Sequence, residues 1–113
     1  VATATNKTIA TLTVPAGIYI VDAHVNFGAN STGVRKIYIG TTEDSYANTR
    51  AISDTRLASN HQATMSNISS ILAVEEQTTY YLNVYQNSGS SLSCSGSLRV
   101  LRIGDYIDFL SSL

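Results

Sequence analysis

Few residues of this chain have the type and spacing that chemistry needs, and Asp22 and His24 come first. They stand two positions apart in a segment that alternates like a β-strand, so their side chains would share one face. Such a pair could belong to a proton relay or form half of a metal site. The other histidine, His61, lies in a polar segment, and a solvated Asp-His pair is the commoner outcome of this spacing. We therefore expect neither a catalytic nor a metal site at these residues.

Adjacent carboxylates and a single cysteine are the remaining candidates. Glu43-Asp44 and Glu75-Glu76 lie in turn-like segments, and neighbouring acids there are more often solvated charge than a glycosidase pair. Cys94 shares a predicted face with Leu92 and Leu98, which favours a small buried hydrophobe over a reactive thiol. No G-x-S-x-G motif is present, and nothing orders a Ser-His-Asp triad. The sequence thus predicts a non-enzymatic protein without a cofactor.

The element that would position most of these groups is Val14 to Phe27, the longest β signal in the chain. Its alternation gives one apolar face and one face that changes from apolar to polar. The apolar face comprises Tyr19, Val21, Ala23, Val25 and Phe27, and the other Ile18, Ile20, Asp22, His24 and Asn26. Pro15-Ala16-Gly17 reads as a tight turn from a preceding strand, so we expect a hairpin.

Further strands are predicted on both sides of this element. Thr41 to Gln62 is expected to be a long loop containing one short strand. Ala63 to Val74 has apolar spacing that also fits a helix, but its Ser, Thr and Asn residues favour a strand. The other expected strands are 7–14, 34–40, 78–87, 92–94 and 98–103, the last two separated by a turn at Ser95-Gly96. At least seven strands without an internal repeat indicate an all-β antiparallel sandwich.

Length and charge limit the classes of protein. With 113 residues the chain is one domain, and its formal net charge of -1 leaves no basic surface for nucleic acid. No apolar run is long enough to insert into a membrane, and one cysteine excludes an internal disulfide. Residues 1–6 read as a tether, 7–103 as the domain and 104–113 as an amphipathic tail. In that tail a short helical turn would place Tyr106, Phe109, Leu110 and Leu113 on one side.

Three tyrosines are predicted on strand faces opposite the core. Tyr38, Tyr81 and Tyr85 point outward in their strands, and Asn83 joins the last two in a stripe. Single surface aromatics need no explanation. Three on one sheet would fit a subunit interface or a sugar-stacking surface. We take these four residues as a candidate interface between subunits.

Several motifs resemble those of a known family. TLTVPAGIYIVDAHVNF resembles the opening of tumour-necrosis-factor-like and complement-subcomponent-q-like globular heads. A closer similarity is to the versions in tail-fibre and baseplate proteins of phages and prophages of Gram-positive bacteria, where Phe27, Asn30, Gly33 and Arg35 match a recurrent pattern. The segment YQNSG at 85–89 and the final RVLRI at 99–103 match late strands of the same domains. The resemblance covers about residues 7 to 103. Glu75-Glu76-Gln77 replaces an acidic Gly-Asp turn of complement-type heads, so no calcium site is carried over.

The resemblance implies a ten-strand jelly roll that assembles as a homotrimer. It implies a phage or prophage tail-fibre or baseplate head that attaches to a bacterial surface receptor, for which we expect a carbohydrate, and a location in the virion or at a cell surface. Two alternatives stay open. One is the trimeric head of a bacterial surface or spore-coat filament, and the other is a carbohydrate-binding module of a secreted enzyme.

Receptor contact is expected at the loop that begins at Thr41. If the last strand runs as in that family, both chain ends lie at one base, together with the Gly28 and Ser88 turns. The Thr41 loop then lies at the far end, with the turns at Pro15, Glu75 and Ser95. Glu43, Asp44 and Tyr46 combine carboxylate acceptors with an aromatic plane, which suits sugar hydroxyls and C–H faces. A solvated loop without a ligand is the alternative.

Overall fold

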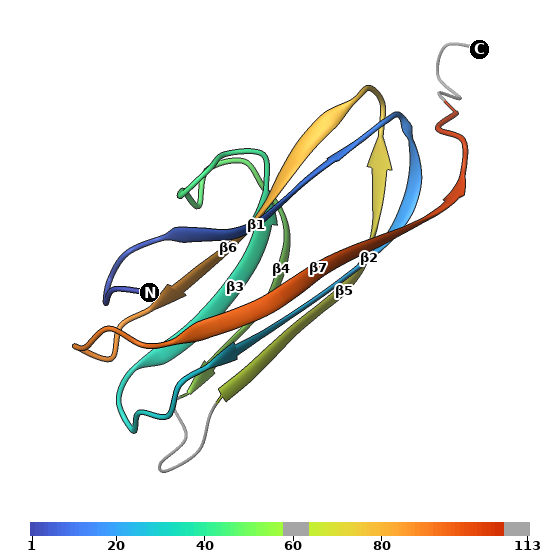
Figure 1. Cartoon of the computed structure of the whole chain (residues 1–113). Coiled ribbons are helices and arrows are strands. Elements are labelled where there is room, and N and C mark those ends of the chain that lie inside the picture. The colour runs from blue at the N-terminus through green and yellow to red at the C-terminus, as the bar shows by residue number, and fades with distance from the viewer. Residues whose placement is uncertain (58–63, 108–113) are drawn as a thin grey trace.

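The computed structural model describes residues 1–57 and 64–107 and shows two antiparallel sheets packed face to face (Figure 1). One sheet has the strand order β1-β6-β3-β4 and the other β5-β2-β7. The strands are β1 (Lys7–Val14), β2 (Gly17–Phe27), β3 (Val34–Gly40), β4 (Thr49–Leu57), β5 (Thr64–Val74), β6 (Thr78–Gln86) and β7 (Cys94–Gly104). The prediction of an all-β antiparallel sandwich is confirmed. The seven strands found in the described part of the chain are fewer than the ten of the resemblance.

The core lies between the two sheets, where the alternation of the strands places it. Tyr19, Val21, Ala23, Val25 and Phe27 of β2 are all buried, as predicted. The facing sheet supplies Ile37, Ile39, Leu82 and Val84, all without exposed surface. Each fully buried aliphatic side chain of this kind contributes about 1.5–3 kcal/mol through removal of apolar surface from water. Strand assignment over 64–74 is confirmed as well, against the helical alternative.

The turn at Pro15 does not form the predicted hairpin, because it connects two different sheets. Val14 pairs with Thr78 of β6, whereas Gly17 pairs with Val74 of β5. The Pro15 and Glu75 turns therefore lie side by side, and each carries the chain from one sheet to the other. Among the seven described strands, only β3 and β4 are consecutive and pair within one sheet.

Strand β7 is continuous, and the predicted turn at Ser95-Gly96 is wrong. Gly96 pairs with Val25, and a Cβ at Gly96 would lie 2.2 Å from the backbone oxygen of His24. The glycine thus allows β2 and β7 to approach closely, a common reason for glycine inside a strand. Strand β4 is also longer than expected, at nine residues.

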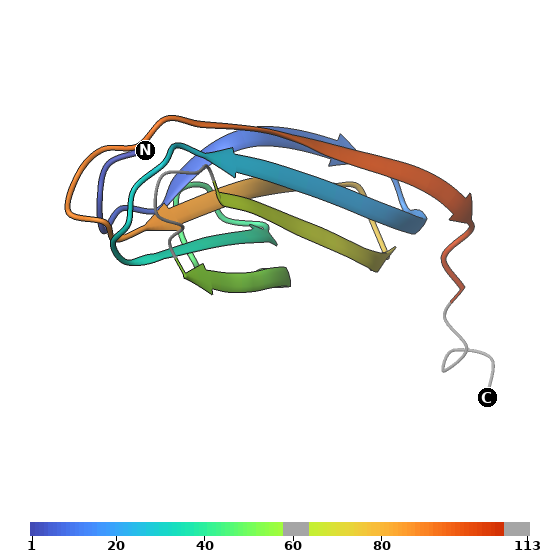
Figure 2. The same cartoon turned by 90° about the horizontal axis from the view of Figure 1, so that it is seen from below.

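Because β7 has no turn, the two ends of the described chain lie at opposite ends of the molecule (Figure 2). Strand β7 ends at Gly104 opposite Ile18, next to the Pro15 turn. The first residues lie at the other end, beside the Ser88 turn. The prediction that both ends share one base is therefore wrong. The molecule measures 55 × 21 × 21 Å along its principal axes.

Residues 1–6, predicted to be a tether, are hydrogen-bonded to the domain. The backbone of Val1 pairs with Leu92, and the Ala4 N–H donates to the Gln86 carbonyl at 2.7 Å. The side-chain amide of Gln86 also donates to the Val1 carbonyl. At the other end, residues 105–107 are not helical, and the Tyr106 hydroxyl donates to Glu75 at 2.7 Å. Phe109, Leu110 and Leu113 of the predicted tail lie outside the described residues.

The four residues of the phage-like pattern form a structural clamp. Arg35 is fully buried and donates to the carbonyl oxygens of Asn30, Thr32 and Val34. This burial lowers the pKa of the Arg35 guanidinium. Gly33 adopts φ 79° directly beside Asn87, whose side-chain oxygen accepts the Val34 N–H at 2.6 Å. The pattern thus fixes the connection between β2 and β3, with Phe27 in the core below.

We predict that Gly33→Ala destabilises the domain more than Gly89→Ala does. Both glycines have positive φ, at 79° and 91°, so both substitutions carry a backbone strain of about 1–2 kcal/mol. A Cβ at Gly33 would also lie 2.5 Å from the Asn87 carbonyl oxygen, whereas none of the described atoms lies within 4 Å of one at Gly89. This overlap should cost a further 1–3 kcal/mol or so. Urea unfolding of both variants measures the difference, and equal losses would contradict the contact.

Candidate functional site

The predicted interface and receptor residues converge on the outer face of sheet β1-β6-β3-β4. In the register of β3 and β6, Lys36 lies opposite Tyr85 and Tyr38 lies opposite Asn83. Tyr81 lies two positions before Asn83 on β6, so it points to the same side. The sequence therefore indicated correctly that these side chains share a face directed away from the core.

The 41–48 loop folds back across this face and covers part of it. The Asn83 amide donates to the carbonyl oxygens of Thr42, at 3.1 Å, and Ser45, at 3.2 Å. Its own oxygen accepts the Thr8 hydroxyl. Asn83 has no exposed surface, so one buried amide joins β6, β1 and the loop. The loop does not stand at a far tip of the molecule, as the sequence suggested.

Tyr38 is fully buried beneath the same loop. Its ring meets that of Tyr46 edge-on, with centroids 5.0 Å apart, and its hydroxyl donates to the side-chain oxygen of Asn6. Burial, reinforced by the nearby Tyr46 and Asp44, raises the pKa of Tyr38 to about 12. Tyr38 and Asn83 were expected to be exposed to another subunit, but the chain's own loop covers them. Tyr81 and Tyr85 remain half-buried.

Asp44 anchors the loop to β1. Its carboxylate accepts the Thr8 N–H at 2.7 Å, and its own N–H donates to the Thr8 hydroxyl at 2.9 Å. Asp44 has φ 51°, a conformation in which Asp is among the better-tolerated residues. The backbone hydrogen bond from Thr8, and also the charge of Lys7, lower the pKa of this carboxyl. One acceptor of the predicted receptor site therefore has a structural role, while Glu43 is exposed.

Two tyrosine rings on this face, one exposed and one half-buried, lie on either side of a lysine. The Lys36 ammonium lies 5.1 Å from the ring centroid of Tyr46 and 5.8 Å from that of Tyr85. We call Lys36, Tyr46 and Tyr85 the Tyr-Lys-Tyr surface. A shallow groove of about 620 Å³ adjoins it, lined by Tyr46, Ala47, Asn48, Thr49 and Arg50. The sequence analysis did not include Lys36 among the site residues. The pairing of Lys36 with Tyr85 in the sheet would have placed it beside the tyrosines.

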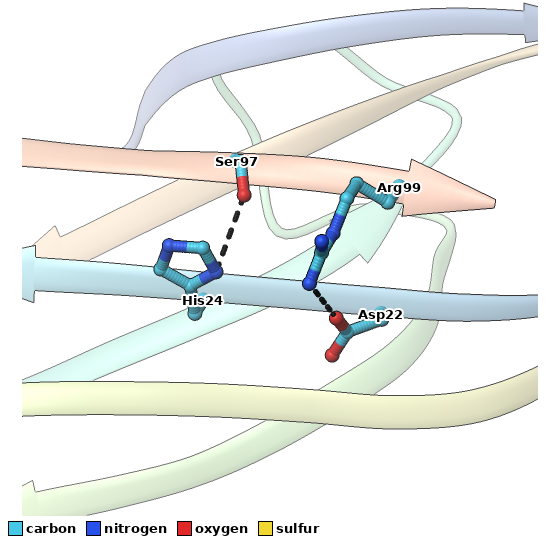
Figure 3. A network of polar contacts seen from close by, with 4 residues as sticks. All are labelled: Asp22, His24, Ser97 and Arg99. Carbon is cyan, nitrogen blue, oxygen red and sulfur yellow. Dashed lines mark hydrogen bonds and ion pairs between the residues drawn. The ribbon is translucent and has the colours of Figure 1, made fainter.

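The other chemical candidates are separated in the structure. Asp22 forms an ion pair with Arg99 at 2.7 Å, and the His24 ring nitrogen Nδ1 lies 3.2 Å from the Ser97 hydroxyl (Figure 3). Each is therefore hydrogen-bonded to β7. Within residues 1–57 and 64–107, no group of three potential metal ligands occurs. Cys94 is partly buried against the core, and burial raises the pKa of its thiol, which disfavours the reactive thiolate.

The two sheets and their strand order define the class of fold, an all-β sandwich of jelly-roll type. No protein-family model and no curated protein sequence matches the chain. Chains in two solved structures of infectious bursal disease virus, of the Gx and Gt strains, are similar, with TM-scores of 0.58 and 0.59. Identity is 15% and 16% over 84% of this chain, so the likeness concerns the fold alone. The matched part is 26% and 27% of those chains, about a quarter of their length.

We predict that Asn83→Leu destabilises the domain and releases the 41–48 loop. Leucine fills a similar volume but leaves the Thr42 and Ser45 carbonyls and the Thr8 hydroxyl without their partner, a loss of about 3 kcal/mol. A protease specific for glutamate should then cleave faster after Glu43, with cleavage at Glu75 as the internal reference. The exposed Asn67→Leu serves as control and should change stability by less than about 0.5 kcal/mol. Unchanged cleavage at Glu43 would show that Asn83 does not hold the loop.

Tyr38 should also make stability fall at high pH. Its pKa is about 12 in the folded chain against 10.0 ordinarily, so between these values the unfolded state loses the proton first. The free energy of unfolding should therefore decrease by about 2 kcal/mol between pH 10 and pH 12. Tyr38→Phe keeps the ring but has no hydroxyl to ionise, so its free energy of unfolding should not show this decrease. Free energies of unfolding from urea titrations that fall equally with pH in both proteins would contradict the assignment to Tyr38.

Proposed function

We propose that this domain is a non-enzymatic structural part of a virus particle, a head of a phage or prophage tail fibre or baseplate. In this proposal it acts as a homotrimer and attaches to a carbohydrate on the bacterial surface. The likeness in fold to chains of a virus structure supports a virion setting. The clamp formed by Asn30, Gly33 and Arg35 supports the phage-like version of the fold, because these are the residues of that pattern.

The observation that carries the attachment proposal is the Tyr-Lys-Tyr surface. Tyr46 is 46% exposed, and Tyr85 and Lys36 are both partly exposed beside it. Tyrosine rings stack on the C–H faces of sugars, and an ammonium group donates hydrogen bonds to sugar hydroxyls. Glu43 of the same loop is exposed, and its carboxylate can accept hydrogen bonds from other hydroxyls.

The surface is held in place before any ligand arrives. Asn83 and Asp44 fix the loop that carries Tyr46, and Tyr38 supports the Tyr46 ring from below. A preorganised site avoids the ordering entropy of 0.5–1.5 kcal/mol or so per immobilised side chain. A shallow site of this kind binds weakly alone, and several copies in one particle would raise the avidity.

Binding to immobilised cell-wall polysaccharides from a panel of Gram-positive bacteria tests this function. Tyr46→Ala should weaken the binding about tenfold, since one aromatic contact of roughly 1–1.5 kcal/mol is lost. Tyr106→Ala removes the same atoms at the far end of the molecule and should leave binding unchanged. Circular dichroism checks that both variants are folded. If the wild type binds and Tyr46→Ala binds equally well, attachment does not occur at the Tyr-Lys-Tyr surface.

A further inference from the structure

The two outer faces of the sandwich differ in how the chain covers them. The 41–48 loop and Asn6 cover part of sheet β1-β6-β3-β4. On sheet β5-β2-β7, no described segment lies over the centre of the outer face, and several aliphatic side chains are exposed. Ile71 is 65% exposed, Leu101 63% and Ile20 40%.

These three side chains form a continuous row across the sheet. Ile20 of the central strand β2 pairs with Ile71 of β5 on one side and with Leu101 of β7 on the other. Directly paired residues on one face have Cβ atoms about 4.5–5.5 Å apart, so the three are neighbours. Ile18 and Ala73 form the next pair along the strands, and Ile103 is 50% exposed at the adjoining bulge. We call these six residues the aliphatic patch. Scattered exposed aliphatics are ordinary, but a contiguous patch indicates an interaction surface.

The charges beside the aliphatic patch favour a second copy of the same chain as its occupant. In the next row, Arg99 and Asp22 form an ion pair whose side chains are 70% and 46% exposed. The face therefore carries one cation and one anion side by side, as seen in Figure 3. Two copies of such a face do not repel each other, and Arg99 of one copy can reach Asp22 of another. A face that carries both charges can therefore contact another copy of the same chain without bringing like charges together.

The area of the face also approaches that of a stable contact. Strands β2, β5 and β7 have 11 residues each. From the rise per residue and the strand spacing, the face measures about 35 Å by 15 Å, or roughly 500 Å² before side-chain relief is counted. A standard interface buries about 800 Å² per partner, so the face with its rims approaches that size.

We propose that copies of this chain associate through the outer face of sheet β5-β2-β7, with the aliphatic patch at the centre of the contact. This inference names the contact surface of the oligomer in the proposed function, and it replaces Tyr38 and Asn83 as interface residues. It does not depend on the Tyr-Lys-Tyr surface, which lies on the opposite side of the sandwich.

Light scattering coupled to size exclusion tests the surface with a matched pair of variants. The wild type should have about three times the chain mass of 12.1 kDa, as the proposed homotrimer requires. Ile71→Glu introduces a charge into the aliphatic patch, which should weaken association at least a hundredfold or so. Thr11→Glu introduces the same charge at an exposed residue of β1, in the opposite sheet, and should keep the wild-type mass. Circular dichroism checks the fold of each variant.

A second test uses the ion pair. Asp22→Arg and Arg99→Asp each leave like charges on the face, so each variant alone should associate less than the wild type. Mixed in equal amounts, the two should recover a larger mass, because opposite charges then meet between copies.

A monomeric wild type, or an Ile71→Glu variant with unchanged mass, would overturn the proposal. Sedimentation of a monomeric wild type with phosphatidylcholine vesicles, absent for Ile71→Glu, would assign the patch to lipid and also overturn it. Tyr46→Ala should keep the wild-type mass whether or not it loses polysaccharide binding, so the attachment site and the contact surface fail separately.

Discussion

The buried amide of Asn83 is the interaction on which the outer face of sheet β1-β6-β3-β4 depends. Its nitrogen and oxygen bond two carbonyls of the 41–48 loop and the hydroxyl of Thr8, so three segments distant in sequence meet at one side chain. A buried polar group without partners costs free energy, and this one is satisfied only while the loop stays folded back. The position of Tyr46, and with it the Tyr-Lys-Tyr surface, follows from this requirement together with the Asp44 anchor on Thr8.

Strand alternation accounts for what the sequence could establish. The apolar face of β2, the burial of Ile37 and Ile39, and the strand over 64–74 follow from a period of two with one face in the core. This pattern says which side a residue faces, but it does not say what covers the far side. Tyr38 and Asn83 were therefore placed on the correct face, while their burial by the loop was not foreseen. That burial depends on contacts with Asn6 and Thr8, more than thirty positions away.

Turns were the weaker part of the prediction, for a related reason. Pro15-Ala16-Gly17 indicates a change of direction, but the same residues serve a hairpin and a crossing between sheets. Pairing of Val14 with Thr78 decides between them, and this partner is distant in sequence. Gly96 looked like a turn residue, but its role is to let β7 approach the backbone of His24. The candidate site could likewise be located only in part, because Glu43, Asp44 and Tyr46 were found by residue type, whereas Lys36 enters through its register with Tyr85.

The placement of β1 and β7 has a mechanical consequence. Strand β1 starts near the Ser88 turn, and β7 ends beside the Pro15 turn, at the other end of a molecule 55 Å long. A tension applied between these two points acts nearly parallel to the strands. Antiparallel hydrogen bonds run perpendicular to the strands, so such a tension loads the β1-β6 and β2-β7 ladders in shear, with many bonds resisting together. Peeling from a strand end would instead break them one after another. The arrangement therefore resists a tension applied in line with the long axis of the molecule.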